Sequence, residues 1–237
     1  MKILVIGDPH GKLPVGLSKI VKKNKVEVII CLGDIPFTPK KAWLEEVWTK
    51  AVIKKSTNSY KQLVDKLCSY NLPVLTLRGN MFHGEYTKVT YKIFKKHKNL
   101  FHRTVGSFSV KGKTFILIDM LYEPHNLRGR KRLSKRRRES VKRREKKLNL
   151  LLEKANDFVL VSHVPPYKIL DKVTWKERPK EWKCENVGSK ILLKAIKKHK
   201  PKYVFCGHIH EAKGKKRVGK TEVYNVGCCG DYLLLDI

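Results

Sequence analysis

Acidic residues are scarce in this sequence. The 237 residues include 53 Lys and Arg but only 21 Asp and Glu, which gives a formal net charge of +32. Thermophilic proteins enrich Lys, but they usually enrich Glu alongside it, and here Glu does not keep pace. The excess of cations therefore favours a polyanionic partner such as nucleic acid. A merely solvated basic surface is the alternative.

Long apolar runs are also missing. No stretch approaches the roughly 20 apolar residues of a membrane-spanning helix, and the first apolar run, Ile3–Ile6, is too short for the core of a signal peptide. The six cysteines include no Cys-x-x-Cys spacing, so no secreted disulfide framework is indicated. We therefore expect no membrane association and a reducing, cytoplasmic location.

The sequence does contain five short apolar runs that end in residues able to bind metals. Each run is rich in β-branched residues and bounded by turn residues, so each is predicted to be a buried strand. Open α/β sheets place their ligands beyond the carboxyl ends of strands. The five ends supply enough carboxylate, imidazole and amide groups for two metal ions. In chain order these residues are Asp8, His10, Asp34, Asn80, His163, His208 and His210.

The residue types and their spacing suit transition metals. Asp8 and His10 are two residues apart, so their side chains can point the same way if the chain stays extended, and His208 and His210 repeat this spacing. Carboxylate and imidazole together favour Mn, Fe, Zn, Ni or Co over Ca. Asp34 is the natural bridging ligand, because one charged oxygen between two cations reduces their repulsion. Taken singly, each residue has an ordinary alternative as a turn former, helix cap or packed loop residue.

The ordered series Asp-x-His, Gly-Asp, Gly-Asn, His and Gly-His-x-His resembles the calcineurin-like metallophosphoesterases. The resemblance runs from Asp8 to His210 and the strand-rich tail beyond, and the basic form is similar to small archaeal members. It implies a four-layer αββα sandwich, in which two mixed β-sheets are flanked by helices. Periodicity alone indicates only an α/β fold with a mixed sheet. The length fits a single metallophosphoesterase domain over residues 1–237.

The resemblance also implies two divalent metals and how the ligands divide between them. Manganese is the expected metal at both positions. The first metal would be held by Asp8, His10, Asp34 and His210, and the second by Asp34, Asn80, His163 and His208. A hydroxide that bridges the metals would then attack phosphorus, while the cations neutralise charge on the phosphate oxygens. Asp34 and Asn80 are therefore expected to be essential for catalysis.

The sequence departs from the family pattern directly after Asn80. Many members carry a His there that protonates or orients the leaving group, whereas this chain has Met81. His83 and His125 are candidates to replace that His, although ordinary structural roles are favoured for both. Arg78 is a candidate phosphate contact, with a solvated loop residue as its alternative.

Hydrophobic periodicity and turn residues predict the remaining elements. Strands are expected at Lys2–Gly7, Val26–Leu32, Val74–Leu77, Val105–Val110, Thr114–Asp119, Phe158–Val161, Tyr203–Cys206, Thr221–Val226 and Tyr232–Asp236. Helices are expected at Val15–Lys23, Glu85–Lys96 and Ser189–Lys198, with two more between Pro39 and Ser69 that are separated by a break at Ser56–Ser59.

A basic helical arm is predicted at about residues 126–150. Residues 128–147 hold 13 Lys and Arg and two Glu, and a block of like charge often marks an interaction segment. Leu148, Leu151 and Leu152 follow at helical spacing and should dock the helix on the core. The arm from Arg128 to Lys147 is expected to bind RNA or DNA, with a frayed, solvated helix as the alternative.

Together these features predict a metal-dependent phosphoesterase, and more specifically a phosphodiesterase acting on a nucleotide or nucleic acid. One alternative is a catalytically weak, metal-containing scaffold that binds RNA, DNA or protein, which Met81 favours. A second alternative is a phosphomonoesterase for a small metabolite, which would not need the basic arm.

Overall fold

The computed structural model describes residues 1–39, 48–81, 92–119, 134–174 and 185–237. The chain forms two compact units, each with its own β-sheet. The first consists of residues 1–102 and 228–237, and the second of residues 103–227. The candidate residues His83 and His125 lie outside the described residues, as do most of the predicted helix at Glu85–Lys96 and the amino-terminal part of the basic arm.

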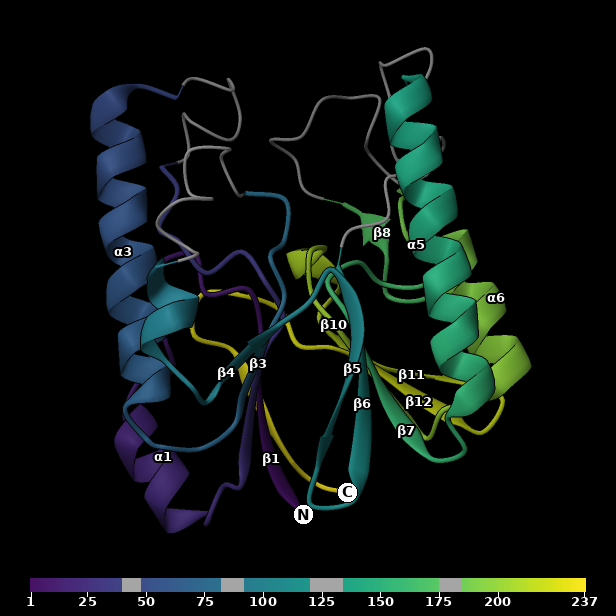
Figure 1. Ribbon diagram of the computed structural model, residues 1–237, viewed down its shortest axis with the longest axis horizontal. Coiled ribbons are helices and arrows are strands. Elements are labelled where there is room, and N and C mark those ends of the chain that lie inside the picture. Colours follow the sequence, from purple (N-terminus) through teal and green to yellow (C-terminus); the bar gives the residue numbers. More distant parts are fainter. Residues whose placement is uncertain (40–47, 82–91, 120–133, 175–184) are drawn as a thin grey trace. The chain divides into compact units, whose positions relative to one another are not determined.

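The first unit contains a five-stranded sheet in the order β13-β1-β2-β3-β4. Strands β1 to β4 run parallel, and β13 pairs antiparallel with β1. The last strand of the chain thus completes a sheet that the first strand begins, and both termini lie at this sheet (Figure 1). The strands are β1 (Lys2–Ile6), β2 (Val28–Cys31), β3 (Val74–Thr76), β4 (Leu100–His102) and β13 (Tyr232–Asp236).

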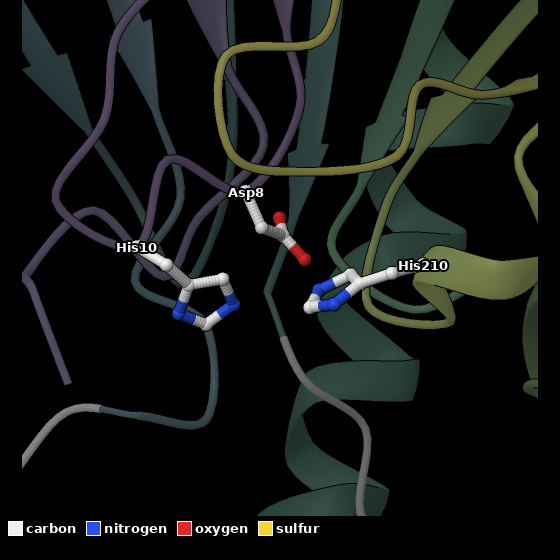
Figure 2. A group of neighbouring side chains, drawn as sticks. All are labelled: Asp8, His10 and His210. Carbon is white, nitrogen blue, oxygen red and sulfur yellow. The ribbon is translucent and has the colours of Figure 1, made fainter. Parts of the chain in front are cut away.

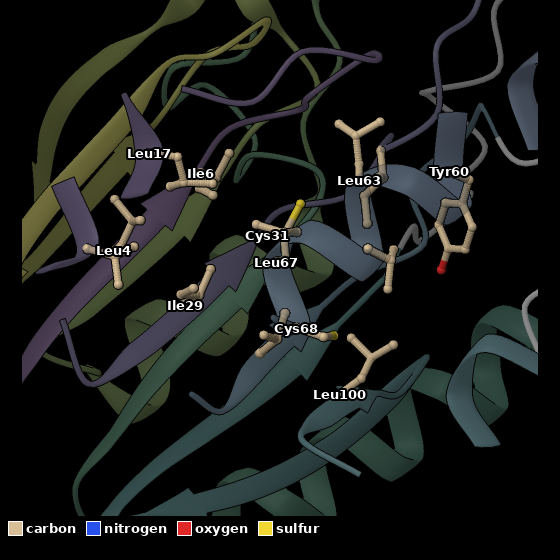
Figure 3. Packing of buried hydrophobic residues seen from close by; sticks show 14 of the residues in the cluster. Leu4, Ile6, Leu17, Ile29, Cys31, Tyr60, Leu63, Leu67, Cys68 and Leu100 are labelled. Carbon is tan, nitrogen blue, oxygen red and sulfur yellow. The ribbon is translucent and has the colours of Figure 1, made fainter. Parts of the chain in front are cut away.

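Helices α1 (Leu17–Lys23) and α3 (Lys50–Cys68) pack on this sheet through one apolar cluster (Figure 3). The strands contribute residues at alternate positions, such as Leu4 and Ile6 of β1, because alternate side chains of a strand point to the same face. Helix α3 contributes a stripe at helical spacing that includes Tyr60, Leu63 and Leu67. This packing fixes the carboxyl ends of β1, β2 and β3, where the candidate ligands of the first unit follow.

The second unit contains a six-stranded sheet in the order β11-β12-β10-β7-β6-β5. The four inner strands run parallel, and the two edge strands β5 and β11 pair antiparallel with their neighbours. The strands are β5 (Val105–Val110), β6 (Lys113–Ile118), β7 (Phe158–Ser162), β10 (Tyr203–Cys206), β11 (Gly214–Val218) and β12 (Thr221–Asn225). A separate two-stranded pair joins β8 (Lys172–Val173) and β9 (Glu185–Asn186), and a 3₁₀ turn, η3, covers His210–Ala212.

Helices α5 (Lys135–Lys154) and α6 (Lys190–His199) pack on the six-stranded sheet (Figure 1). Each begins at a serine whose hydroxyl accepts a hydrogen bond from a backbone N–H of the first turn, which is a standard helix cap. Ser134 caps α5 and Ser189 caps α6. The apolar residues of both helices, including Leu148 and Leu152 of α5, are buried against the sheet.

The predicted class, an α/β fold with two mixed sheets flanked by helices, is confirmed. The predicted hairpin of β5 and β6 and the predicted ranges of β10 and β13 are also correct. The described part of the basic arm is helical from Lys135, and its apolar residues dock it on the core. Among the described residues, no helix is both long enough and apolar enough to cross a membrane.

The predicted helix break at Ser56–Ser59 is wrong, because α3 runs through it without interruption. The hydroxyl groups that suggested a break form hydrogen bonds within the helix or to the neighbouring residue Phe37. Ser56 donates to the carbonyl of Phe37, Thr57 donates to the carbonyl of Ile53 one turn back, and Ser59 accepts from the N–H of Phe37. Because these hydroxyls are hydrogen-bonded, polar residues remain within the helix, and Ser56 does so even though it is fully buried.

Sequence periodicity also missed four strands, β4, β8, β9 and β11. Strands β8 and β9 have only two residues each, which is too short for any periodic pattern. Strand β4 has three residues, too few to show alternation. Strand β11 is rich in lysine and arginine and has no buried residue, so it lacks an apolar pattern. Charged residues of this kind are typical of edge strands, where they discourage pairing with other chains.

The docking of α5 gives a stability prediction. Leu148 is fully buried, whereas Leu150, two residues further along α5, is 50% exposed. Leu148→Ala should lower the free energy of unfolding by about 2–5 kcal/mol, because it removes buried methyl groups and leaves a cavity. Leu150→Ala is the control and should change it by less than about 0.5 kcal/mol. Urea denaturation followed by circular dichroism measures both, and equal losses would show that α5 is not docked through Leu148.

Candidate metal centre

In the first unit, candidate ligands follow three adjacent parallel strands. Asp8 and His10 lie in the loop after β1, Asp34 follows β2, and Asn80 follows β3. Figure 2 shows the side chains of Asp8 and His10 on the loop that carries them, together with His210. One ligand atom of Asp8 and one of His10 lie within 4.8 Å of each other. Asp8 and Asp34 are buried, and His10 is partly exposed.

Backbone hydrogen bonds hold these three loops together. The N–H of His10 donates to the carbonyl of Asp34 at 2.9 Å, and the N–H of Asp34 donates to the carbonyl of Arg78 at 3.3 Å. The loop after β1 is also anchored on its other side, where the N–H of Cys229 donates to the carbonyl of Asp8 at 2.9 Å. Asp8, His10 and Asp34 are therefore each placed by a backbone hydrogen bond to a neighbouring loop.

The two carboxylate oxygens of Asp34 have different surroundings. Oδ1 accepts a hydrogen bond from the backbone N–H of Met81 at 2.7 Å. Oδ2 lies 4.0 Å from Nε2 of His10. This division fits a carboxylate that is oriented through one oxygen and offers the other to a metal, as expected for a bridging ligand.

Asn80 is oriented by the residue that follows it. The amide nitrogen of Asn80 donates to the Sδ atom of Met81 at 3.2 Å. An amide binds metals through its oxygen, so this contact uses the end of the side chain that a metal does not need. Arg78, the candidate phosphate contact, is exposed at the start of the same loop.

In the second unit, candidate ligands follow the central parallel strands β7 and β10. His163 comes directly after β7 and is fully buried, and His208 comes two residues after β10. Their rings lie with centroids 5.0 Å apart, and a nitrogen of each lies within 4.8 Å of the other. The two loops are joined by a hydrogen bond from the N–H of Gly207 to the carbonyl of His163 at 3.0 Å. His210 begins the η3 turn that follows.

Asn225 is not a candidate site residue from sequence, yet it holds the loop that carries His208 and His210. It lies at the end of β12 and is 2% exposed. Its amide nitrogen donates to the carbonyls of Ile209 at 2.8 Å and Leu170 at 3.2 Å, and its amide oxygen accepts from the N–H of Gly227 at 3.0 Å. Ile209 stands between His208 and His210, so the buried amide sets the position of that loop. A lone Asn in an apolar strand carries no sequence signal for this role.

The backbone conformation supports the fit of these residues to metal ions. His10, Asp34 and His208 all have positive φ angles, of 45°, 43° and 67°. Non-glycine residues seldom adopt this left-handed region, which costs free energy, and such strain concentrates at functional sites. Three of the seven predicted ligands adopt this conformation, which Asp and His tolerate better than most residues, so it is compatible with a metal site as well as with ordinary turns.

Gly79 provides a second observation of fit, because it leaves room for Asp34. Its φ angle is +78°, and a Cβ atom at this position would lie 2.1 Å from Oδ1 and 2.5 Å from the backbone nitrogen of Asp34. Only glycine lets the loop after β3 approach the carboxylate this closely. Together with the donor set of carboxylates, imidazoles and an amide, these features suit divalent transition metals.

Comparisons with known proteins agree with this description of the fold. A Methanocaldococcus jannaschii protein, the uncharacterized MJ1162, is 26% identical over 234 residues, which cover 95% of this chain and 87% of that protein. One crystal structure, 18% identical, has a TM-score of 0.68 and covers 99% of this chain and 94% of its own. GAP50, the anchor in the inner membrane complex of Plasmodium, is 15% identical with a TM-score of 0.53 and covers 97% of this chain and 71% of its own.

The two solved structures show a shared fold, whereas the family is shown by the sequence. The model of the calcineurin-like phosphoesterases matches residues 1–212. That range contains every candidate ligand from Asp8 to His210 in the order in which the sequence presents them. The chain therefore belongs to the calcineurin-like phosphoesterase family.

Proposed function

We propose that the protein is a dinuclear metal-dependent phosphodiesterase. In this proposal Asp8, His10 and His210 hold one metal, His163, His208 and Asn80 hold the other, and Asp34 bridges the two. The observation that carries the proposal is the setting of Asp34, whose Oδ1 is fixed by the N–H of Met81 while Oδ2 faces Nε2 of His10. Membership of a phosphoesterase family supports the reaction class.

The roles of the chain's own groups follow from their chemistry. When bound, two divalent metals, with manganese favoured, supply charge for the phosphate oxygens and lower the pKa of a water molecule toward neutrality. Asp34 would supply a carboxylate ligand to both metals, and the backbone N–H of Met81 keeps that carboxylate oriented. Arg78, which is exposed beside Asn80, offers a guanidinium group to the phosphate. The substrate class we propose is a nucleotide or nucleic-acid phosphodiester, with the basic helix α5 as the segment that attracts it.

One observation favours a second candidate function, a catalytically weak metal-containing scaffold. Met81 carries a thioether at the position where many family members have a histidine, and a thioether cannot protonate a leaving group. The two candidates agree on metal binding and differ on turnover, so the same metal-loaded protein separates them.

The metal centre is tested by removing its bridging ligand. Asp34→Ala should lose both metals and all hydrolysis of an activated aryl phosphodiester, whereas His208→Ala and His210→Ala should each weaken a different site. Loss of a ligand should cost at least the roughly 10–100-fold in affinity that loss of a supporting partner costs. Asp157→Ala is the control, because Asp157 pairs with Lys113 at the surface. Elemental analysis and Mn²⁺ titration measure the effect, and a wild-type protein without stoichiometric metal would contradict the proposal.

Gly79 allows a test that leaves every proposed ligand in place. Gly79→Ala should weaken Mn²⁺ binding by at least about 10–100-fold, because its Cβ atom would displace the carboxylate of Asp34. Gly112→Ala is a matched control, since Gly112 has the same φ angle of +78° but nothing within 4 Å of the added Cβ. Both variants carry a similar backbone penalty of about 1–2 kcal/mol. Equal Mn²⁺ affinity in the two variants would show that the close approach to Asp34 is not needed.

The side chain at position 81 gives a prediction about leaving groups. General acid catalysis typically contributes about 10²–10⁴-fold, so without an acid at Met81 activated aryl diesters should react far faster than alkyl or ribose esters. Met81→His should recover part of this difference, whereas Met81→Leu should not. Both variants keep the backbone N–H that holds Asp34. The slope of log kcat against leaving-group pKa is the measurement. A flat slope in the wild type would point to another acid, and His83 and His125 would then be the residues to mutate.

A further inference from the structure

Helices α5 and α6 are neighbours on the six-stranded sheet of the second unit. Both contribute to one apolar cluster, through Leu148 and Leu152 of α5 and Leu192 and Ile196 of α6. Each helix leads by a short loop into one of the parallel neighbouring strands β7 and β10. The two helices therefore run in the same direction, as Figure 1 shows.

The outer surface of this helix pair carries far more basic than acidic residues. Helix α5 holds ten Lys and Arg and three Glu, and α6 holds four Lys and no acid. In α6 the residues Lys190, Lys194 and Lys197 recur at the spacing i, i+4, i+7 and are all exposed, so they form a stripe on one side of the helix. In α5 most of the cations between Lys135 and Lys147 are exposed as well.

An ion pair joins the two helices near their carboxyl ends. Nζ of Lys198 in α6 lies 3.6 Å from the carboxylate of Glu153 in α5. This ion pair uses one of the few acids of the helix pair and lies far along α5 from Arg136 and Arg143. The remaining cations of both helices are exposed, except Arg144, which is partly buried.

We propose that the outer face of α5 and α6 together binds the phosphate backbone of a nucleic acid, so that α6 extends the surface predicted for the basic arm alone. Helix α5 is about 30 Å long at 1.5 Å per residue, a length that spans about nine phosphates of one strand at 3.4 Å each. Guanidinium groups bind phosphate oxygens through paired hydrogen bonds. The face contains no exposed aromatic residue among the described residues of either helix, so binding should be independent of base sequence.

An anionic membrane is the other polyanion to consider, and the apolar residues argue against it. A helix that lies on a membrane inserts an apolar face between the lipids. The apolar faces of α5 and α6 are instead buried in the core of the unit. Within the described residues of these two helices, Leu150 is the only exposed large apolar side chain. A phosphate backbone in water requires only the cations.

The proposal rests on the phosphodiesterase function only for the choice of a phosphodiester partner, and its test does not depend on turnover. The full-length variant Lys190→Gln, Lys194→Gln and Lys197→Gln removes the α6 stripe. The control removes the same number of exposed charges from α1 in the first unit, as Lys19→Gln, Lys22→Gln and Lys23→Gln. A fluorescein-labelled single-stranded oligonucleotide of about 20 nucleotides is titrated by anisotropy at several salt concentrations.

The slope of log affinity against log salt counts the phosphates neutralised, at about −0.7 for each phosphate of a single strand. The α6 variant should flatten the slope by up to about 2, and the α1 control should leave it unchanged. Hydrolysis of a small aryl diester should be the same in all three proteins. An unchanged slope in the α6 variant, or affinity for anionic vesicles without affinity for the oligonucleotide, would overturn the proposal. Loss of aryl diester hydrolysis in the wild type would instead count against the proposed function alone.

Discussion

The hydrogen bond between the N–H of Met81 and Oδ1 of Asp34 ties the loops of the first unit into one arrangement. The backbone of Asp34 also contacts both neighbouring loops. Its carbonyl accepts a hydrogen bond from the N–H of His10 in the loop after β1, and its N–H donates to the carbonyl of Arg78 in the loop after β3. It does so with a φ angle of 43°, a conformation that its neighbours must stabilise. Gly79 makes that stabilisation sterically feasible, because any side chain there would overlap the carboxylate. One carboxylate thus organises the backbone, and in the proposed site its other oxygen is the one that would bind metal.

This arrangement separates metal binding from proton transfer. The contact that orients Asp34 comes from the backbone of Met81, so it does not depend on which side chain occupies that position. In the proposed site, the side chain at position 81 can therefore differ without disturbing the orientation of Asp34, and without an acid there the proposed reaction would need leaving groups that depart without a proton. The thioether of Met81 also accepts a hydrogen bond from the amide of Asn80. This contact positions Asn80 and involves no proton transfer.

Sequence reasoning predicted the strands that carry the site, because buried parallel strands produce short apolar runs, and the polar residues that end them are conspicuous. It did not predict the features that lie in the backbone. The positive φ angles of His10 and His208 and the buried amide of Asn225 produce no periodic pattern in the sequence. Helix α3 was divided in two because local hydroxyl groups outweighed a buried face that only the packed structure reveals. Strand β11 was missed because an edge strand made of cations has no apolar alternation.

The few acidic residues of the chain include several whose carboxylates are buried or hydrogen-bonded. Asp8 and Asp34 are buried candidate ligands. Asp171 is buried as well, and its carboxylate accepts two backbone N–H groups within the second unit. Burial opposes the ionisation of Asp65, but hydrogen bonds from His97 and Lys96 lower its pKa. Of these four acids, Asp171 and Asp65 bind neighbouring groups and Asp8 and Asp34 are proposed metal ligands, and none of them lies on α5 or α6. The formal net charge of +32 attracts anions in general, so the proposed phosphodiester partner would be concentrated near the protein before any specific contact forms.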